Sequence, residues 1–355
     1  MKILPRLESA NYSICLFPLR RGGQLESEFT ESGIKICNSN IKYLGVRGRF
    51  KSIFNLCYTL FQEKPDIIHY FLPAAYMVGT MCSIFSPKSI RLMSRRSLNN
   101  YQAKRPFIKF IEYKIHNFTH LIIGNSKAVI KQLQNESIEL EKLKLIYNGL
   151  DIPEKINENL RNKARINLSL EDNVLVFTVV ANLIPYKGHK DLFFAFSNIT
   201  ESLPEEWILF CIGRDEGYKN KLSELIIKLN LQDHIKFIRH TRSIKNYLYA
   251  SDIGILPSHQ EGFSNGLLEG MAFGLPMIAT NVGGNPEAII NNENGFIVPP
   301  NDPNKLGERI LDLAMNRGLR ERFGGNAYDY VKKNFSIDQC VNKYIDIYKN
   351  LIQTR

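Results

Sequence analysis

The sequence predicts an α/β fold of two domains, each built on a parallel β-sheet. The chain has 355 residues, which is long for a single core, so two domains of ordinary size are expected. Strand-like and helix-like stretches alternate along it, which is typical of βαβ units. Residues 174–181 form an unbroken run rich in β-branched side chains, as in a strand covered by helices on both faces.

The expected strands are distributed over both halves of the chain. In the first half they lie at residues 12–18, 34–37, 66–71, 90–93, 120–123 and 144–147. After a polar connection they continue at residues 174–181, 207–213, 235–239 and 253–257. A last helix, 338–352, has apolar residues at three-four spacing on one face. We therefore expect an N-terminal domain over residues 1–165, a C-terminal domain over 166–335 and a closing helix over 336–355 that crosses back to the first domain.

Cysteine usage and hydropathy limit the compartment. Six cysteines are scattered without a C-x-x-C pair or a histidine cluster, which predicts neither a zinc site nor a disulfide framework and favours a reducing cytoplasm. No secretory signal begins the sequence. Residues 67–87 carry no formal charge, but His69, Pro73 and Gly79 interrupt them, so we expect a buried strand and a helix there rather than a membrane span.

The positive charge is concentrated in the first half. Residues 1–150 carry 22 lysines and arginines against 10 aspartates and glutamates, whereas residues 151–355 carry 24 against 25. Residues 88–131 alone hold ten basic side chains and one acid, Glu112, with aromatic and aliphatic residues between them. Such a surface suits anionic lipid or a diphosphate-bearing lipid acceptor, and the alternative is a solvated basic face. Nucleic acid is not expected, since no recognised binding module accompanies the charge.

Residues 252–299 carry the strongest chemical signal. An apolar run at 253–257 predicts a buried strand that enters a polar loop, and the following GLLEGMAF has helical spacing. Ser264 or Asn265 is the expected N-cap. The helix would aim free N–H groups and its positive dipole end at the loop, and Gly266 would let a ligand approach the backbone. This arrangement predicts a diphosphate site.

Two carboxylates flank the expected diphosphate site. Glu261 lies before the helix and Glu269 lies about one turn inside it, so one ligand across the N-terminus could touch both. Carboxylates accept paired hydrogen bonds from sugar or ribose hydroxyls, while the helix end takes the phosphates. The stretch therefore predicts a nucleotide-sugar site.

The same stretch resembles the Glu-x7-Glu signature of the family 4 retaining glycosyltransferases, a large group with the GT-B fold. The likeness rests on EGFSNGLLEGMAFGLPMIAT, and it continues through VGGNPE, NGFIVPP and Asp302-Pro303. Upstream, residues 125–128 and 146–151 resemble segments of the family's N-terminal domain. The resemblance implies two Rossmann-like domains that face a cleft, with the acceptor held by the first and the nucleotide sugar by the second.

The resemblance also implies roles for single residues. Glu261 would contact hydroxyls of the donor sugar, and Lys187 would contact the donor diphosphate and neutralise charge on the departing nucleotide, so these two are the catalytic candidates. Glu269 would bind the ribose, and residues 240–242 would seat the base. The remaining donor-binding candidates are Asn182, Gly213, Arg214, Phe263, Ser264, Asn265, Gly266 and Leu267. Relatives often have arginine where Asn182 stands, so a second cation is either missing or supplied by Arg214 or Lys190.

The beginning of the chain departs from the family pattern, because the lead into the strand at 66–71 is short. Two registers are open. Either residues 13–19 with Arg21-Gly22-Gly23 form the family's first strand and loop, or they form its second strand and the first is absent. The following GQLESEFTESGIKI favours the second register. A first domain without its opening strand would leave a sheet edge or a core face exposed.

A second departure concerns the acceptor side. Many relatives have a histidine facing the transferred sugar, whereas this chain has Arg95 and Arg96. Guanidinium groups pair phosphate bidentately, so we expect these arginines to hold an anionic acceptor. His69 is the nearest alternative histidine and is more typical of a satisfied core residue. No Asp-x-Asp motif occurs, in agreement with the metal independence usual for the family's fold, and no cofactor is expected beside the UDP- or GDP-sugar substrate.

Taken together, these features predict a metal-independent retaining glycosyltransferase. It would move a hexose or N-acetylhexosamine to an acceptor, expected to be a lipid-linked saccharide of surface polysaccharide, lipopolysaccharide or capsule biosynthesis. The expected location is the cytoplasm, peripheral on the inner face of the membrane. The alternative is a truncated, catalytically silent homologue that binds a nucleotide sugar or a partner transferase.

Overall fold

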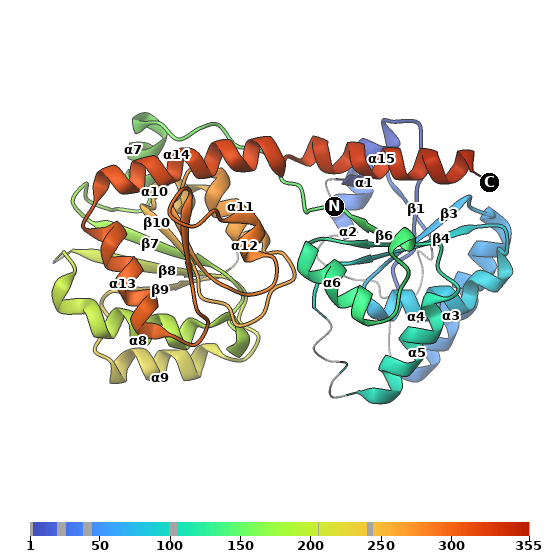
Figure 1. Ribbon diagram of the computed structural model, residues 1–355, viewed down its shortest axis with the longest axis horizontal. Helices are drawn as coiled ribbons and strands as arrows, with labels where there is room; N and C mark the ends of the chain where they lie inside the picture. Colours follow the sequence, from blue (N-terminus) through green and yellow to red (C-terminus); the bar gives the residue numbers. More distant parts are fainter. Residues whose placement is uncertain are drawn as a thin grey trace. The chain divides into compact units, whose positions relative to one another are not determined.

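The chain forms two compact units in the computed structural model, which describes residues 3–19, 26–37, 45–98, 102, 105–204, 206–239 and 244–354 (Figure 1). The first unit comprises Met1–Gly149 and Ile337–Arg355, and the second comprises Leu150–Ser336. The division after Gly149 lies earlier than the expected one after residue 165. The reason is that α7 (Glu158–Asn167) packs against α10 (Ile244–Ala250) inside the second unit.

The second unit is built on one sheet in which all paired neighbours are parallel. Its described strands are β7 (Leu175–Val180), β8 (Trp207–Ile212), β9 (Ile235–Ile238), β10 (Ile253–Leu256), β11 (Met277–Thr280) and β12 (Gly295–Val298). Their order in the sheet is β12-β11-β10-β7-β8-β9. The strand order reverses between β7 and β10, which are neighbours in the sheet. Open parallel sheets bind ligands at such a switch point.

Helices cover both faces of this sheet (Figure 1). Besides α7 and α10 the described helices are η4 (Pro185–Lys187), α8 (His189–Ile199), η5 (Thr200–Ser202), α9 (Lys219–Lys228), α11 (Asn265–Ala272), α12 (Asn285–Ala288), α13 (Pro303–Ala314) and α14 (Arg317–Asn334). Phe177 and Leu209 point into the core that α8 and α13 close, while Val176 and Ile208 lie in the cluster that α10 covers. The alternation explains why these strands are apolar throughout.

The first unit contains a parallel sheet of β3 (Ile67–Phe71), β4 (Ile90–Arg95), β5 (Leu121–Gly124) and β6 (Leu143–Leu145), in that order. A separate parallel pair consists of β1 (Cys15–Leu16) and β2 (Lys35–Ile36). The described helices are α1 (Ile3–Glu8), α2 (Glu26–Glu31), α3 (Gly45–Glu63), α4 (Pro73–Cys82), η1 (Ser83–Phe85), α5 (Pro106–His116), α6 (Lys127–Asn135), η3 (Leu140–Lys142) and α15 (Ile337–Gln353).

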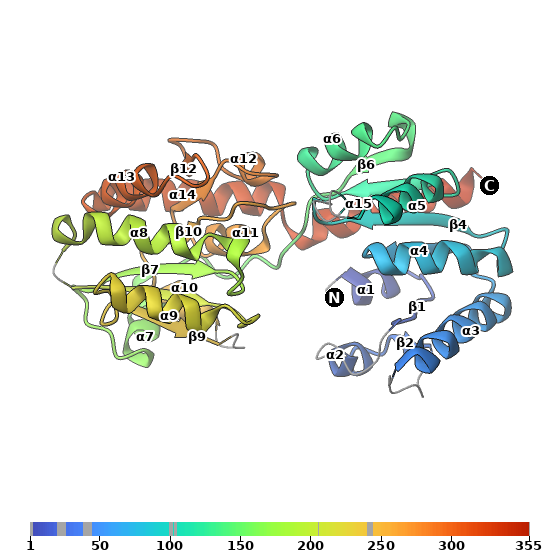
Figure 2. The same cartoon turned by 90° about the horizontal axis from the view of Figure 1, so that it is seen from below.

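The two faces of the β3–β6 sheet are covered by different helices. On one face Leu7 of α1 and Tyr344 of α15 are buried with Leu92 and Ile123 of the strands. On the other face Tyr76 of α4 is buried with residues of α5 and α6. Helix α3 packs on α4 and η1, so α3, α4 and α5 lie side by side (Figure 2).

The structure bears on the question of the opening strand. Among residues 3–19 a helix, α1, precedes β1, and Leu7 of this helix is buried in the core that α15 covers. Of the sheet edge or core face that the absence of an opening strand was expected to expose, the core face is covered in part by α1. The predicted loop at Arg21-Gly22-Gly23 lies outside the described residues.

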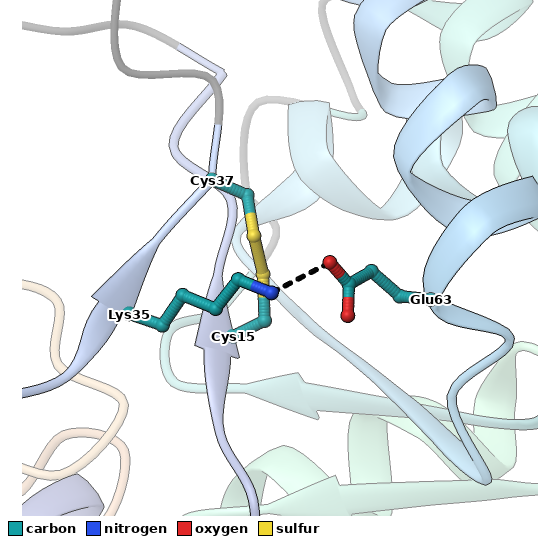
Figure 3. Close-up of a disulfide and its surroundings, with 4 residues drawn as sticks. All are labelled: Cys15, Lys35, Cys37 and Glu63. Carbon is teal, nitrogen blue, oxygen red and sulfur yellow. Dashed lines mark hydrogen bonds and ion pairs between the residues drawn. A yellow bond between two sulfur atoms is a disulfide. The ribbon is translucent and has the colours of Figure 1, made fainter.

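A disulfide links Cys15, at the start of β1, to Cys37, directly after β2 (Figure 3). Their Cα atoms are 6.2 Å apart, within the usual range for a disulfide. Beside the bond, Nζ of Lys35 lies 2.7 Å from Oε1 of Glu63 (Figure 3). The sequence analysis predicted no disulfide framework, because scattered cysteines do not reveal which pair the fold brings together.

Candidate functional site

The two catalytic candidates meet at the switch point of the second sheet. Lys187 ends η4, which follows β7, and Glu261 lies in the loop that follows β10. Nζ of Lys187 donates to Oε1 of Glu261 at 2.6 Å. Ser258, which is fully buried in the same loop, donates its hydroxyl to the same oxygen at 2.7 Å. The fold thus places a cation and a carboxylate together at the sheet edge where ligands bind.

Further contacts join the loops that carry this pair. The backbone N–H of His259 donates to the carbonyl of Tyr186 at 2.8 Å. The ring Nε2 of His259 lies 2.6 Å from Oδ2 of Asp191, in the first turn of α8. The sequence analysis gave no role to His259, Asp191 or Ser258. Their positions could have indicated a role, because Ser258 and His259 follow β10 closely and Asp191 lies in α8, the helix after Lys187.

The turn after Lys187 requires glycine. Gly188 has φ +73°, in the left-handed region, and it is the N-cap of α8. A Cβ at this position would overlap the main-chain carbonyl of Pro257, at the end of β10. Because glycine tolerates the positive φ and has no Cβ to clash with Pro257, the two loops can approach closely enough for the Lys187–Glu261 contact.

His189, the first residue of α8, is a fully buried histidine beside the site. Neither ring nitrogen has a hydrogen-bond partner within the described structure. Burial lowers the pKa of His189 to about 4, and the positive charge of Lys187 acts in the same direction. The ring is therefore neutral at neutral pH and adds no charge to the Lys187–Glu261 pair.

Helix α11 begins beside Glu261, and Ser264 is its N-cap. The hydroxyl of Ser264 accepts the N–H of Leu267 at 3.4 Å. Phe263 is buried, and its ring centroid lies 5.2 Å from that of Phe335, while Leu267 is buried as well. Asn265 is exposed. The side chains of Phe263 and Leu267 belong to the core, so a ligand could meet these positions only through the backbone.

Two glycines among the donor-binding candidates serve the packing of the main chain. A Cβ on Gly266 would overlap the carbonyl of Val180, and a Cβ on Gly213 would overlap the carbonyl of Ala181. The sequence analysis assigned the missing side chain of Gly266 to ligand approach. The structure gives a different reason, since α11 must lie against the end of β7.

The other donor-binding candidates lie at the ends of β7 and β8 and in α11. Oδ1 of Asn182 accepts the backbone N–H of Arg214 at 3.2 Å. The guanidinium of Arg214 is exposed, with Nη2 3.7 Å from Oε1 of Glu216. Glu269 is half-buried in the second turn of α11. Residues 240–242, expected to seat a base, lie outside the described residues.

The loop after β11 closes against the loop that holds Glu261. The N–H of Gly284 donates to the carbonyl of Gly262 at 3.0 Å. Gly283 has φ +52°, and a Cβ there would overlap the carbonyl of Glu261. This close approach explains physically why glycine stands at position 283 in VGGNPE.

The two acceptor-binding candidates have different environments in the first unit. Arg95 is buried, and its Nη1 lies 2.5 Å from Oε1 of Glu136, whose other oxygen is 3.0 Å from Nε2 of His116. The expectation that Arg95 holds an acceptor is corrected, because its charge is compensated in the interior. Arg96 is exposed and donates from Nη2 to Oδ1 of Asn148 at 2.7 Å.

His69 is a half-buried residue of β3 whose two ring nitrogens both have hydrogen-bond partners. Its Nε2 lies 2.8 Å from the Ser94 hydroxyl, and its Nδ1 lies 2.6 Å from the Tyr348 hydroxyl. Burial lowers the pKa of His69 to about 3, and the charge of Arg96 contributes. These contacts support its interpretation as a satisfied core histidine.

In the part of the chain that the structure describes, no three side chains of His, Cys, Asp and Glu gather in a way that could hold a metal ion. No helix in that part combines the length and apolarity needed to cross a membrane.

The second unit has the strand order of a Rossmann fold, with polar residues at its switch point, and the first unit contains the parallel β3–β6 sheet; two such α/β units are typical of a GT-B fold. Solved structures agree. The crystal structure of Anabaena HepE in complex with UDP matches with a TM-score of 0.85 and 19% identity, covering 98% of this chain and 95% of that one.

Sequence comparison gives the family. The family model described as Glycosyltransferase Family 4 matches residues 3–154, and that described as Glycosyl transferases group 1 matches residues 160–330. The chain belongs to the group 1, family 4 glycosyltransferases.

Several curated relatives are similar over much of the chain. A capsular polysaccharide biosynthesis glycosyltransferase, CapM of Staphylococcus aureus, is 26% identical over 295 residues, which is 81% of this chain and 77% of CapM. An Escherichia coli UDP-Gal:alpha-D-GlcNAc-diphosphoundecaprenol alpha-1,3-galactosyltransferase is 26% identical over 317 residues, 85% of this chain and 80% of the relative. An uncharacterized glycosyltransferase of Methanocaldococcus jannaschii, MJ1178, is 32% identical over 244 residues, 68% of this chain and 62% of its own length.

Proposed function

We propose that the protein is a retaining, metal-independent glycosyltransferase that moves a hexose or N-acetylhexosamine from a UDP- or GDP-sugar to an acceptor hydroxyl. The observation that carries the proposal is the 2.6 Å contact between Lys187 and Glu261 at the switch point of the second sheet. Family membership and the UDP bound by HepE support a nucleotide-sugar donor.

In the proposed reaction the acceptor oxygen bonds to the anomeric carbon of the sugar. The bond from that carbon to the diphosphate oxygen breaks, and the acceptor proton leaves with the nucleoside diphosphate. Lys187 and the N–H groups at the start of α11 would stabilise the charge that grows on the diphosphate. Glu261 would accept hydrogen bonds from hydroxyls of the donor sugar, and Glu269 would accept hydrogen bonds from hydroxyls of the ribose. Before the donor binds, Lys187 and Glu261 compensate each other's charge.

For the acceptor we propose a lipid-linked saccharide at the inner face of a membrane, used in surface polysaccharide, lipopolysaccharide or capsule synthesis. The names of CapM and of the E. coli relative, which describe capsule synthesis and a diphosphoundecaprenol acceptor, support this class. The excess positive charge of residues 1–150 and the exposed residue Arg96 suit an anionic acceptor at an acidic membrane surface.

The test is nucleotide release from a panel of UDP- and GDP-sugars, with and without an undecaprenyl-diphosphate-linked sugar. Wild type is compared with Lys187→Met and Glu261→Gln. The control is Lys305→Met, because Lys305 also contacts a carboxylate, Glu308, at 2.6 Å but on the exposed surface of α13.

We expect release from one donor class, lowered roughly 10²- to 10³-fold by either site substitution and unchanged in the control. Release that neither substitution lowers would contradict the proposed site. Silence of wild type across the whole panel, with one donor still bound, would favour the catalytically silent homologue instead.

A further inference from the structure

Helix α3 exposes a stripe of aromatic side chains. Phe50, Phe54, Tyr58 and Phe61 are 69%, 71%, 60% and 55% exposed. Their spacing of four, four and three residues places them on one side of the helix. Single exposed apolar residues are common on soluble proteins, but a continuous aromatic stripe along one helix indicates an interaction surface.

The stripe is not needed to hold α3 on the unit. Leu56 and Leu60 lie on another side of the helix and are buried with Cys82 of α4. These two leucines, together with the contacts that α3 makes to α4 and η1, account for its packing. The aromatic side chains are therefore available to another molecule.

Neighbouring elements also expose apolar side chains. Phe107 and Phe110 of α5 are also exposed, and α4 lies between α3 and α5 (Figure 2). Exposed apolar side chains at the end of α4 and in η1, next to α3, belong to Met81, Ile84 and Phe85. The four residues of the α3 stripe together with Phe107 and Phe110 are called the aromatic surface below.

The charges around the aromatic surface are positive. Lys109 and Lys114 are exposed on α5, with their Nζ atoms 5.4 Å and 5.5 Å from the ring centroids of Tyr113 and Phe110. Lys51 is exposed on α3. The carboxylates that the structure describes on α3, α4 and α5 already have partners. Glu63 pairs with Lys35, and Glu112 is buried and accepts a hydrogen bond from Gln102.

We propose that the aromatic surface rests in the headgroup region of a bilayer that contains anionic lipid. Aromatic rings inserted among headgroups, with lysines around them, are the combination by which interfacial helices bind acidic membranes. A second copy of the chain fits less well, since a symmetric contact would bring the lysines of both copies together. This proposal rests on the proposed function, which gives membrane binding its biological purpose. It places the main membrane contact on α3, outside the basic segment 88–131.

The experiment is cosedimentation of the full chain with vesicles of phosphatidylcholine alone and of phosphatidylcholine with phosphatidylglycerol. Phe50→Ser/Phe54→Ser is compared with a control double variant, Ile166→Ser/Ile227→Ser, which removes two comparably exposed apolar side chains from the second unit. We expect wild type and control to bind the acidic vesicles equally, and the α3 variant to bind roughly tenfold or more weakly. Thermal midpoints should not change, because no buried group is altered.

A fluorescence measurement locates the contact. Trp207 is the single tryptophan of the chain and is buried in the second unit. Any vesicle-induced change in emission of a Tyr58→Trp variant therefore reports position 58. We expect a blue shift with acidic vesicles, as the indole leaves water.

Several outcomes would overturn the proposal. They are an absence of wild-type binding to acidic vesicles, undiminished binding by the α3 variant, and unshifted emission from Tyr58→Trp. A concentration-dependent dimer that the α3 variant abolishes would identify a second copy as the occupant. Failure of the membrane proposal can be distinguished from failure of the proposed function. The Lys187→Met variant should still bind vesicles, and the α3 variant should still hydrolyse the donor.

Discussion

Replacing the buried His189 by leucine should change how the stability of the second unit depends on pH. An unfolded chain protonates this histidine below about pH 6.5, whereas burial and the nearby Lys187 lower the pKa in the folded chain to about 4. Between these values the unfolded state binds more protons, so the folded state loses stability as the pH falls. Leucine removes the titrating group and keeps an apolar side chain near Phe193, whose ring centroid is 6.5 Å away.

The size of the effect follows from the pKa difference. Each pKa unit corresponds to about 1.4 kcal/mol, and pH 5 lies roughly 1.5 units below the unfolded pKa while it is still above the folded one. His189 should therefore make the second unit about 2 kcal/mol less stable at pH 5 than at pH 7. The His189→Leu variant should lack this part of the pH dependence.

The assay is urea unfolding followed by the fluorescence of Trp207, which is buried in the core of the second unit and thus reports that unit. A matched control is His69→Asn, because the pKa of His69 is also lowered, to about 3, but in the first unit. The control should keep the pH dependence of the Trp207 transition. The reasoning is refuted if His189→Leu and wild type lose the same free energy of unfolding between pH 7 and pH 5.

Three further predictions concern residues that the fold places unexpectedly. Asp252→Ala should cost the second unit roughly 3–5 kcal/mol in the same assay, because the carboxylate accepts from Arg161 at 2.6 Å and lies 3.6 Å from the buried Arg165, whose charge would lose compensation. Gly188→Ala should lower nucleotide release more than tenfold, since its Cβ would push apart the loops that carry Lys187 and Glu261; unchanged release would contradict this role. Arg96→Ala should weaken acceptor-dependent transfer without changing the thermal midpoint, and an equal loss of donor hydrolysis would argue against an acceptor role.

Most strands were predictable because they are largely apolar runs whose side chains meet helices on both faces of a sheet. Every stretch expected as a strand overlaps a strand of the structure, although β11 and β12 were not among the expectations. That Lys187 and Glu261 lie close together was predictable for a related reason, whereas their roles rest on the family resemblance. Lys187 and Glu261 each follow a strand closely, and a parallel sheet brings the ends of its strands to one edge.

The features that were missed depend on contacts between residues distant in sequence. The polar helix α7 shows no apolar face that predicts its partner. It is fixed instead by Arg165, which donates to the carbonyls of Ala250 and Val174 and lies near Asp252. Arg95 gave no sign of burial, because Glu136, which compensates its charge, lies 41 residues away. The disulfide between Cys15 and Cys37 escaped prediction for the same reason.

Helix α15 follows the second unit in the chain but covers the first. Its Val341 and Tyr344 are buried with Leu92 and Ile123 of the first sheet. During synthesis these strands leave the ribosome long before the helix that shields them, while all of Leu150–Ser336 is made in between. The second unit can therefore complete its core first. Until α15 emerges, one apolar face of the earlier unit remains open to water and to chaperones.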